Sequence, residues 1–328
     1  MAFADSDNKK VIRDGWDLPI LDRWSGVIGR KLTYFGLPGP RMLDLRAWAS
    51  ILERRRDAVE ERPNLKAKRA LADEAAAELQ RNALRYGLAD GLEILRGDVG
   101  EIIMDGVDKL GVQPQLSDAQ PAERARFAYD LHNLDFDGGL GFIVRRTGEA
   151  PRVDAIKKLI ERQKGHSFVL MLTVNVRNTL GPNIEDFLDR LNRLPAGDLI
   201  GWYQSRGAGE VEHRLKAVVP IIVRGAGEAA GFVVSCYPPV AYTGHESARM
   251  VHFCFELTTE DRVFAGVSHQ QDADLLQLPL LEAVDGLIRF APLQHDACDR
   301  DSAVAAISFL KPELASGDLA ERLRALAH

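Results

Sequence analysis

The sequence predicts an α/β protein built on a doubly wound sheet, with a parallel core followed by an antiparallel hairpin. Short apolar runs alternate with segments of helical pattern up to about residue 180, which is typical of βαβ units around a parallel sheet. After residue 230, two strand-like runs follow each other with no room for a helix, so we expect them to pair antiparallel. Acidic residues and glycines stand where several of the apolar runs end, which suits a ligand site.

The first βαβ unit follows an N-terminal arm, residues 1–30, whose tryptophans we expect to pack onto the body of the protein. Lys31–Phe35 is a strand-like run, and the turn Gly36–Pro40 stops it, because glycine and proline so spaced mark a tight turn. A short helix follows at Met42–Trp48. The apolar run Ala49–Leu52 is interpreted as a second strand that ends on Glu53.

The rest of the chain continues the alternation and then changes character. The further expected elements are a helix at 64–86 closed by Gly87, a strand at Leu92–Leu95 ending at Asp98, a loop at 111–124, a strand at Phe127–Leu134 ending at Asp135 and Asp137, a helix at Arg152–Gln163, a strand at Ser167–Val176, and the antiparallel strands Gly231–Tyr237 and Met250–Leu257. Residues 209–229 stay ambiguous because Pro220 interrupts a helical pattern. We expect an arm (1–30), one main domain (31–270) and a helical C-terminal extension (271–328) packed on it.

Composition excludes several classes of protein. The chain has 328 residues and a net charge of −6, which argues against a nucleic-acid binder driven by overall charge but leaves room for a local basic patch. Its three cysteines are too few and too scattered for a disulfide framework, so a reducing cytoplasm is the simpler expectation. The sequence shows no secretory signal and no apolar run of about 18 residues, so no membrane contact is expected.

The strand ends carry residues with a physical use for an adenosine-bearing ligand. Gly36 and Gly39 would let the backbone approach the ligand closely. The carboxylate of Glu53 could accept hydrogen bonds from both ribose hydroxyls, and Asp98 could lie beside the adenine amine. Asp135 would lie near the reacting end.

The order and spacing of these residues resemble the class I S-adenosylmethionine-dependent methyltransferases, over about residues 30–180. Gly36 and Glu53 are 17 residues apart, about the length of a turn, a helix and a strand. The similar segments are Ala77-Glu-Leu-Gln-Arg-Asn82 with Leu92-Glu-Ile-Leu-Arg-Gly-Asp98-Val, which run into the third-strand acid, and Tyr129-Asp-Leu-His-Asn-Leu-Asp135-Phe-Asp-Gly138, which resembles the fourth motif. Within the class, the chain looks most similar to tRNA guanine-N2 dimethyltransferases and three-Cys-motif partner proteins. The resemblance implies a Rossmann-like methyltransferase sheet with paired sixth and seventh strands.

It also implies S-adenosylmethionine as cofactor, bound by Gly36, Gly39, Glu53, Asp98 and Asp135. Transfer would go to a nucleic-acid or other base-bearing acceptor, and catalysis would be mainly positioning. In that function Asn133 and Asp135 would accept hydrogen bonds from an acceptor amine, Phe136 would stack on a flat base, and Asp137 would help remove the proton.

A second function, that of a binding protein and not an enzyme, stays open. Tyr34 and Phe35 stand where the family carries a first-strand acid, which favours a catalytically degenerate relative that binds a nucleotide or a partner protein, for example in a bacterial phage-defence system. Each acid also has a plainer interpretation: Glu53 as part of a solvated charged run, Asp98 as a helix cap, and Asp135 with Asp137 as turn residues.

No metal is expected. His245, His252, Cys236 and Cys254 lack paired metal-ligand spacing, and core burial suits Cys254 and His252 better. The segment Gly138–Gly141 follows the fourth strand rather than opening the first βαβ unit, which disfavours a nicotinamide oxidoreductase.

Overall fold

A computed structural model of the chain describes residues 6–60, 69–106, 108, 128–136, 139–140, 151–163, 165–176, 211–244, 247–259 and 280–290. Within these ranges one mixed sheet runs through the molecule, in the order β10-β9-β7-β8-β5-β4-β1-β2-β3, with β6 also paired to β8. Strands β3, β2, β1, β4 and β5 are parallel to one another. This is the doubly wound order in which the strand sequence reverses between β1 and β4.

The strands have the following bounds: β1 Leu32–Gly36, β2 Leu52–Glu60, β3 Leu92–Arg96, β4 Leu131–Asp135, β5 Phe168–Asn175, β6 Phe232–Cys236, β7 Val240–Thr243, β8 Arg249–Thr259, β9 Leu281–Val284 and β10 Leu287–Phe290. The helices are α1 Asp7–Val11, the π-helix η1 Ile12–Asp17, α2 Leu18–Ile28, α3 Leu43–Ala47, α4 Arg69–Arg85, α5 Val99–Asp105, α6 Pro151–Arg162 and α9 Val211–Ala229. The ambiguous span at 209–229 is therefore helical over its described part, with Pro220 inside the helix.

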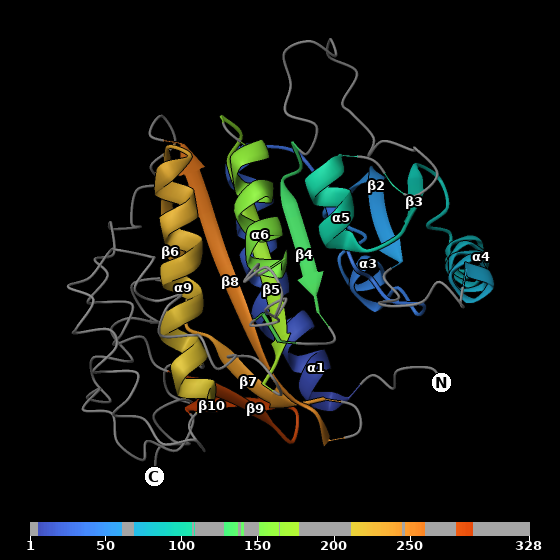
Figure 1. Cartoon of the computed structure of the whole chain (residues 1–328). Coiled ribbons are helices and arrows are strands. Elements are labelled where there is room, and N and C mark those ends of the chain that lie inside the picture. The colour runs from blue at the N-terminus through green and yellow to red at the C-terminus, as the bar shows by residue number, and fades with distance from the viewer. Residues whose placement is uncertain are drawn as a thin grey trace.

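Two hydrophobic cores lie on the two faces of the sheet. Helices α5, α6 and α9 cover one face and stand in front of the sheet in Figure 1. The N-terminal helices, with α3 and α4, bury the opposite face. Strand β5 contributes to both cores because successive side chains of a strand point to opposite faces: Leu170 lies in the first core and Met171 in the second. Its nearly continuous apolar sequence is typical of such a strand.

The antiparallel part of the sheet is built on the long strand β8. One edge of β8 pairs with β5 along eight residues, and its other edge pairs first with β7 and then with β6. The sequence analysis expected β6 and β8 as the paired final strands of a methyltransferase-type sheet, and this is confirmed. The sheet combines strands from both sides of residue 180, because β5 pairs with β8.

Two expectations about local structure are wrong. The second strand does not end at Glu53 but begins at Leu52, because the apolar residues before it form a turn in which Ile51 and Leu52 donate to the Trp48 carbonyl at 3.0 Å. Part of the C-terminal extension is also not helical, since 281–290 contain the hairpin β9–β10. Asp285 and Gly286 both have positive φ (53° and 74°), which is the type I′ turn favoured by an Asp-Gly pair.

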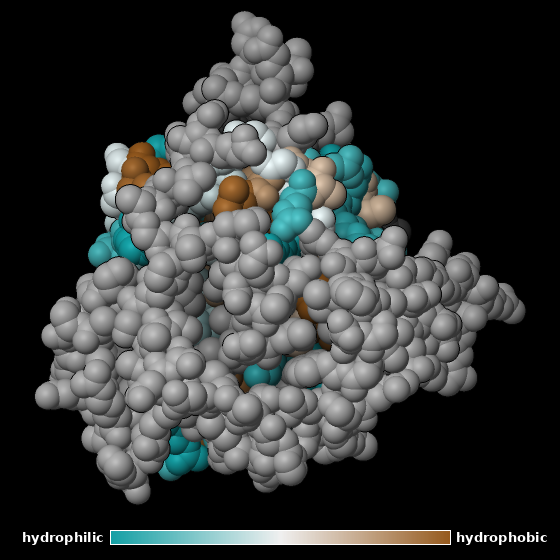
Figure 2. All heavy atoms as spheres, turned by 90° about the vertical axis from the view of Figure 1, so that its left-hand side faces the viewer, coloured by the Kyte–Doolittle hydropathy of each residue, from teal (hydrophilic) through white to brown (hydrophobic). Residues whose placement is uncertain are grey.

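The described surface shows no large apolar face. Its exposed large hydrophobic side chains, Val27, Leu84, Met104 and Leu287, come from four separate elements. Figure 2 shows hydrophilic and hydrophobic side chains mixed among the described residues that are visible on that side. No helix among the described residues is long and apolar enough to cross a membrane.

Candidate active site at the carboxyl ends of β1 and β4

Gly36 and the polar residues of β4 lie next to each other. Gly36 pairs with Asn133 in the parallel register of β1 and β4, and the amide of Leu37 donates to the Asn133 carbonyl at 2.9 Å. A Cβ atom at Gly36 would lie 2.4 Å from the Asn133 carbonyl oxygen and 2.6 Å from the Tyr34 hydroxyl. Packing alone therefore requires glycine at this position.

The turn after β1 is tied to helix α4. Gly39 has a φ of 63°, a conformation that favours glycine, and a Cβ atom there would meet nothing within 4 Å. The side-chain amide of Asn82 donates to the Pro40 carbonyl at 2.8 Å. The open space beside Gly39 contrasts with the crowding at Gly36, so of the two glycines Gly39 is the one with room for a ligand nearby.

Asp98 follows β3 and caps helix α5. Its Oδ1 accepts a hydrogen bond of 3.1 Å from the Glu101 amide, as the plainer interpretation of this residue expected. The side chain is half-buried, at the same edge of the sheet as Gly36. A capping carboxylate retains a second oxygen, so the cap does not prevent contact with a ligand.

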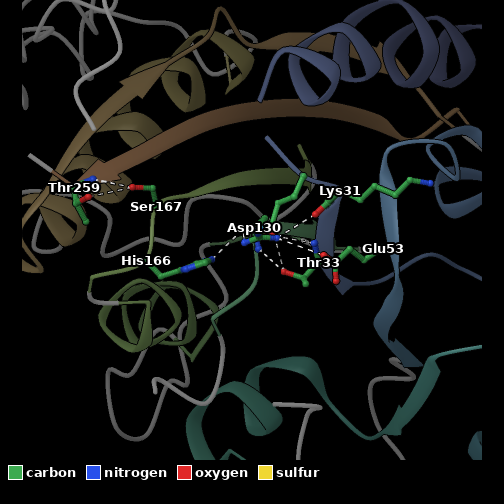
Figure 3. Close-up of polar contacts among 8 residues, drawn as sticks. Lys31, Thr33, Glu53, Asp130, His166, Ser167 and Thr259 are labelled. Atoms are coloured by element: carbon green, nitrogen blue, oxygen red, sulfur yellow. Dashed lines mark hydrogen bonds and ion pairs between the residues drawn. The ribbon is translucent and has the colours of Figure 1, made fainter. Parts of the chain in front are cut away.

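Glu53 lies at the opposite end of the sheet from Gly36. Its neighbour Leu52 pairs with Leu32, the first residue of β1, so Glu53 belongs to the amino edge. Figure 3 shows it beside a network centred on Asp130, which it joins through Arg30 at 3.8 Å. The interpretation of Glu53 as an acid at a strand end is wrong, because its strand runs on for seven more residues to Glu60.

Phe136 points into a core, not toward the polar residues of β4. It is 1% exposed and packs with the helices of the first core, where the Arg152 guanidinium carbon lies 5.0 Å from its ring centroid. Asn133 and Asp135 point to the opposite face, because side chains alternate along a strand. The ring is therefore not presented to a base bound beside these two residues. Asp137 lies outside the described residues.

Asn133 and Asp135 belong to a polar cluster that the sequence analysis did not anticipate. The side-chain amide of Asn133 donates to Asp44 Oδ2 at 2.9 Å, and the Lys9 ammonium forms an ion pair with Asp135 Oδ2. Lys9 comes from α1, which Figure 1 shows near the carboxyl ends of β4 and β5. The arm thus reaches the end of β4, where Lys9 contacts Asp135.

A second hydrogen-bonded chain runs through the same cluster. Nδ1 of His252 lies 2.9 Å from the Thr173 hydroxyl, and Nε2 lies 2.8 Å from Asp17 Oδ1. Thr173 is the register partner of Asp135, which places the chain beside the Lys9 ion pair. All three members, His252, Thr173 and Asp17, are buried. Both imidazole nitrogens are engaged, so in this structure His252 is a hydrogen-bonded core residue.

The π-helix η1 brings two charged groups into this cluster. Arg13 and Asp17 lie at its two ends and are both buried. π-Helical turns are rare and occur frequently at functional sites. The cluster encloses a small cavity of about 20 Å³, which is room for about one water molecule and not for a cofactor. It is lined by Lys9, Ile12, Arg13, Asp17, Asp44, Trp48, Asn133, Asp135, Thr173, Tyr242 and His252.

Burial and neighbouring charges set the protonation states in the cluster. Burial raises the pKa of Asp44 to about 6, an effect to which Asp135 adds and which Lys9 opposes. Burial lowers the pKa of Lys9, but Asp135, Tyr242 and Asp44 together outweigh it and leave the pKa raised. In the same way, Asp17, Asp135 and Asp44 together outweigh burial and raise the pKa of His252. The cluster therefore holds an ammonium group firmly charged beside a carboxyl group that titrates near neutral pH.

The described residues contain no group of three or more histidine, cysteine or acidic side chains that could hold a metal ion. Cys236 and Cys254 are buried and free, and His245 lies outside the described residues.

No family model matches the chain, and no curated protein matches it by sequence. Solved structures do resemble it. An O-methyltransferase family protein from Burkholderia thailandensis matches with 10% identity and a TM-score of 0.34, over 78% of this chain and 59% of that one. An S-adenosylmethionine-dependent methyltransferase from Agrobacterium tumefaciens matches with 13% identity and a TM-score of 0.38, over 74% of this chain and 62% of that one.

A third similar structure is an O-methyltransferase of tomaymycin synthesis from Streptomyces achromogenes, in complex with S-adenosylmethionine. It matches with 14% identity and a TM-score of 0.35, over 79% of this chain and 92% of that one. The chain spans less than two thirds of the Burkholderia and Agrobacterium proteins. The strand order itself establishes the architecture: a Rossmann-like sheet with five parallel strands, extended by the antiparallel strands β8 and β6.

Proposed function

We propose that this chain is an S-adenosylmethionine-dependent methyltransferase that acts on a nucleic-acid or other base-bearing acceptor. The observation that supports it most is the meeting of Gly36, Asn133 and Asp135 at the carboxyl end of adjacent parallel strands. In doubly wound sheets ligands bind at this edge, near the point where the strand order reverses. The reversal here falls between β1 and β4, which carry these three residues.

The cofactor would lie across the ends of β1, β2 and β3. The turn containing Gly39 would pass close to its methionine part, and the free oxygen of Asp98 would accept a hydrogen bond from the adenine amine. Strand β2 ends at Glu60, which pairs in register with Arg96, two residues before Asp98, so the ends of β2 and β3 lie at the same edge of the sheet.

The acceptor would approach Asp135. Lys9 contacts the Oδ2 atom, and no described residue donates to Oδ1, which could accept a hydrogen bond from an acceptor amine or hydroxyl. The bound cofactor would supply the activated methyl group. The protein would orient the acceptor, and the exposed fraction of the Asp135 side chain, 21%, is enough for one further contact.

The test is a radiolabelled methyl-transfer assay on RNA, DNA and protein extracts, combined with calorimetry of cofactor binding. Asp135→Ala should abolish transfer and leave cofactor affinity within about threefold, because the lost contact belongs to the acceptor. Glu161→Gln, a change in an exposed ion pair of α6, is the control. Equal incorporation by the wild type and Asp135→Ala would remove Asp135 from the mechanism.

A second candidate function is cofactor-free binding of a nucleotide or a protein partner by a degenerate methyltransferase fold. Tyr34 favours it: this side chain is fully buried and extends to Gly36, and the resemblance places it where the family carries a first-strand acid. An acid at that position would offer a partner to a cationic methionine group, and a tyrosine with a raised pKa stays neutral and does not. Absence of both cofactor binding and label incorporation would select this candidate.

A further inference from the structure

Two exposed arginines lie over one aromatic ring, and a third belongs to the same side of helix α4 as one of them. The guanidinium carbon of Arg46, from α3, lies 4.2 Å from the centre of the Tyr86 ring, and that of Arg85, from the end of α4, lies at 5.7 Å. Arg81 is also exposed and precedes Arg85 by four residues, which places both on one side of the helix. We call Arg46, Arg81, Arg85 and Tyr86 the arginine surface.

Within the described part of the chain, these three arginines have no acidic partner, unlike Arg23, Arg30 and Arg249. Arg30 binds Asp130, Arg23 binds Glu256, and Arg249 bridges two glutamates. None of the ion pairs in the described part of the chain includes a member of the arginine surface, and the contacts shown for Arg46 and Arg85 are those with the Tyr86 ring. In a chain with a net charge of −6, three unneutralised guanidinium groups so close together form a local site for anions.

The arginine surface adjoins the candidate cofactor turn. Asn82, between Arg81 and Arg85 in α4, donates its side-chain amide to the Pro40 carbonyl at 2.8 Å. Helix α3, which carries Arg46, follows that turn. A ligand bound on the arginine surface would therefore lie beside the carboxyl edge of the sheet.

We propose that the arginine surface binds single-stranded nucleic acid and guides it to the methyl-transfer site. Guanidinium groups match the geometry of phosphate oxygens and form bidentate hydrogen bonds with them. The planar Arg46 group, stacked on Tyr86, offers a flat face on which an unpaired base can stack, because bases in single strands stack on aromatic rings and on arginine planes. The inference rests on the proposed function for the identity of the acceptor, while binding itself does not require transfer.

The experiment measures fluorescence anisotropy of a labelled 20-nucleotide single-stranded RNA of mixed sequence with the full chain. The triple variant Arg46→Gln, Arg81→Gln, Arg85→Gln should bind at least about tenfold more weakly. Its slope of log affinity against log salt should fall by about 2, the value for three lost phosphate contacts on a single strand. Thermal unfolding followed by circular dichroism verifies that the variant is folded.

A matched control removes the same charge elsewhere. Lys31→Gln, Lys158→Gln, Arg289→Gln changes three other solvent-exposed cations and should alter RNA affinity by less than about twofold. Equal weakening in both triple variants, or no RNA binding by the wild type, would overturn the proposal. Competition by polyglutamate as effective as that by unlabelled RNA would assign the surface to acidic proteins instead.

Calorimetry with S-adenosylmethionine separates this proposal from the proposed function. If RNA binding depends on the arginine surface but no cofactor binds, the arginine surface is supported and the methyltransferase function is refuted. If the cofactor binds but the Arg46, Arg81, Arg85 variant keeps its RNA affinity, the methyltransferase function is supported and the role of the arginine surface is refuted.

Discussion

Replacing Asp130 by asparagine should destabilise the protein from the amino edge of the sheet. The Asp130 side chain is 2% exposed and accepts hydrogen bonds from both guanidinium nitrogens of Arg30, at 2.6 and 2.8 Å. The amide and hydroxyl of Thr33 each donate to it at 2.9 Å, and His166 Nε2 lies at 3.1 Å (Figure 3). The carboxylate thus joins the starts of β1 and β4 to the turn before β5.

The magnitude follows from the pKa of Asp130. Burial raises this pKa, but the hydrogen bonds from His166, Arg30 and Thr33 outweigh burial and lower it from 3.8 to about 2. That difference corresponds to about 2 kcal/mol of stability. Because Arg30 is about half-exposed, it regains water when Asp130 is replaced, so we expect a cost of about 2–3 kcal/mol and not the larger cost of a fully buried pair.

Urea unfolding of Asp130→Asn and wild type, at pH 7 and pH 3, tests this value. A lowered carboxyl pKa contributes stability that is complete above the unfolded value of 3.8 and is lost as the pH falls through about 2. The gap between the two proteins should therefore narrow by about 1 kcal/mol at pH 3. The exposed pair of Lys158 and Glu161 is the control, with Glu161→Gln costing less than about 0.5 kcal/mol. A gap that is absent at pH 7, or that stays constant with pH, refutes the reasoning.

Two further predictions concern the carboxyl edge. Gly36→Ala should lower the free energy of unfolding by at least about 2 kcal/mol, measured by thermal unfolding, because its Cβ would lie 2.4 Å from a backbone oxygen. The control Gly100→Ala should cost less, since the tightest contact of its Cβ would be 3.0 Å to the side chain of Asp98. Equal costs would contradict the packing argument. Asp44→Asn should raise the free energy of unfolding, and the gain should be about 2 kcal/mol larger at pH 8 than at pH 4. The reason is that the pKa of Asp44 is raised from 3.8 to about 6, so its carboxyl group makes the wild-type protein less stable as the pH rises through this range. A pH-independent effect of Asp44→Asn would show that the carboxyl group is not destabilised by burial.

Much of the parallel sheet could be predicted from the sequence. Apolar runs bounded by turn residues locate β1, β3 and β5 to within one or two residues. For β1 and β5 the reason is that a strand buried on both faces must be largely apolar. The rule failed for β2, whose charged sequence resembles a solvated segment although it lies between β1 and β3. Its position is determined by pairing with its neighbours, which a local pattern does not contain. The β9–β10 hairpin, in contrast, could have been predicted, because the pair Asp285-Gly286 is typical of a two-residue hairpin turn.

The polar cluster could be predicted only in part. Asn133 and Asp135 follow from their place at the end of a strand. Lys9, Asp44 and His252 join them from segments remote in sequence, and no local pattern marks a lysine near the chain start as the partner of an aspartate 126 residues later. Such contacts depend on how the helices dock on the sheet, which sequence periodicity does not specify.

The attachment of the N-terminal arm has a consequence for how the chain matures during synthesis. The arm is made well before its polar partners: Asp17 binds His252, Arg23 binds Glu256, and Asn8 accepts from the Gly286 amide at 3.3 Å. Domains generally fold as units while the chain emerges from the ribosome. The arm must therefore wait for more than 200 residues before it docks, and a polypeptide truncated before β8 would leave the two arm tryptophans without their full packing surface. The arm segment that covers the end of β4 thus has its full set of contacts only after β8 has been made.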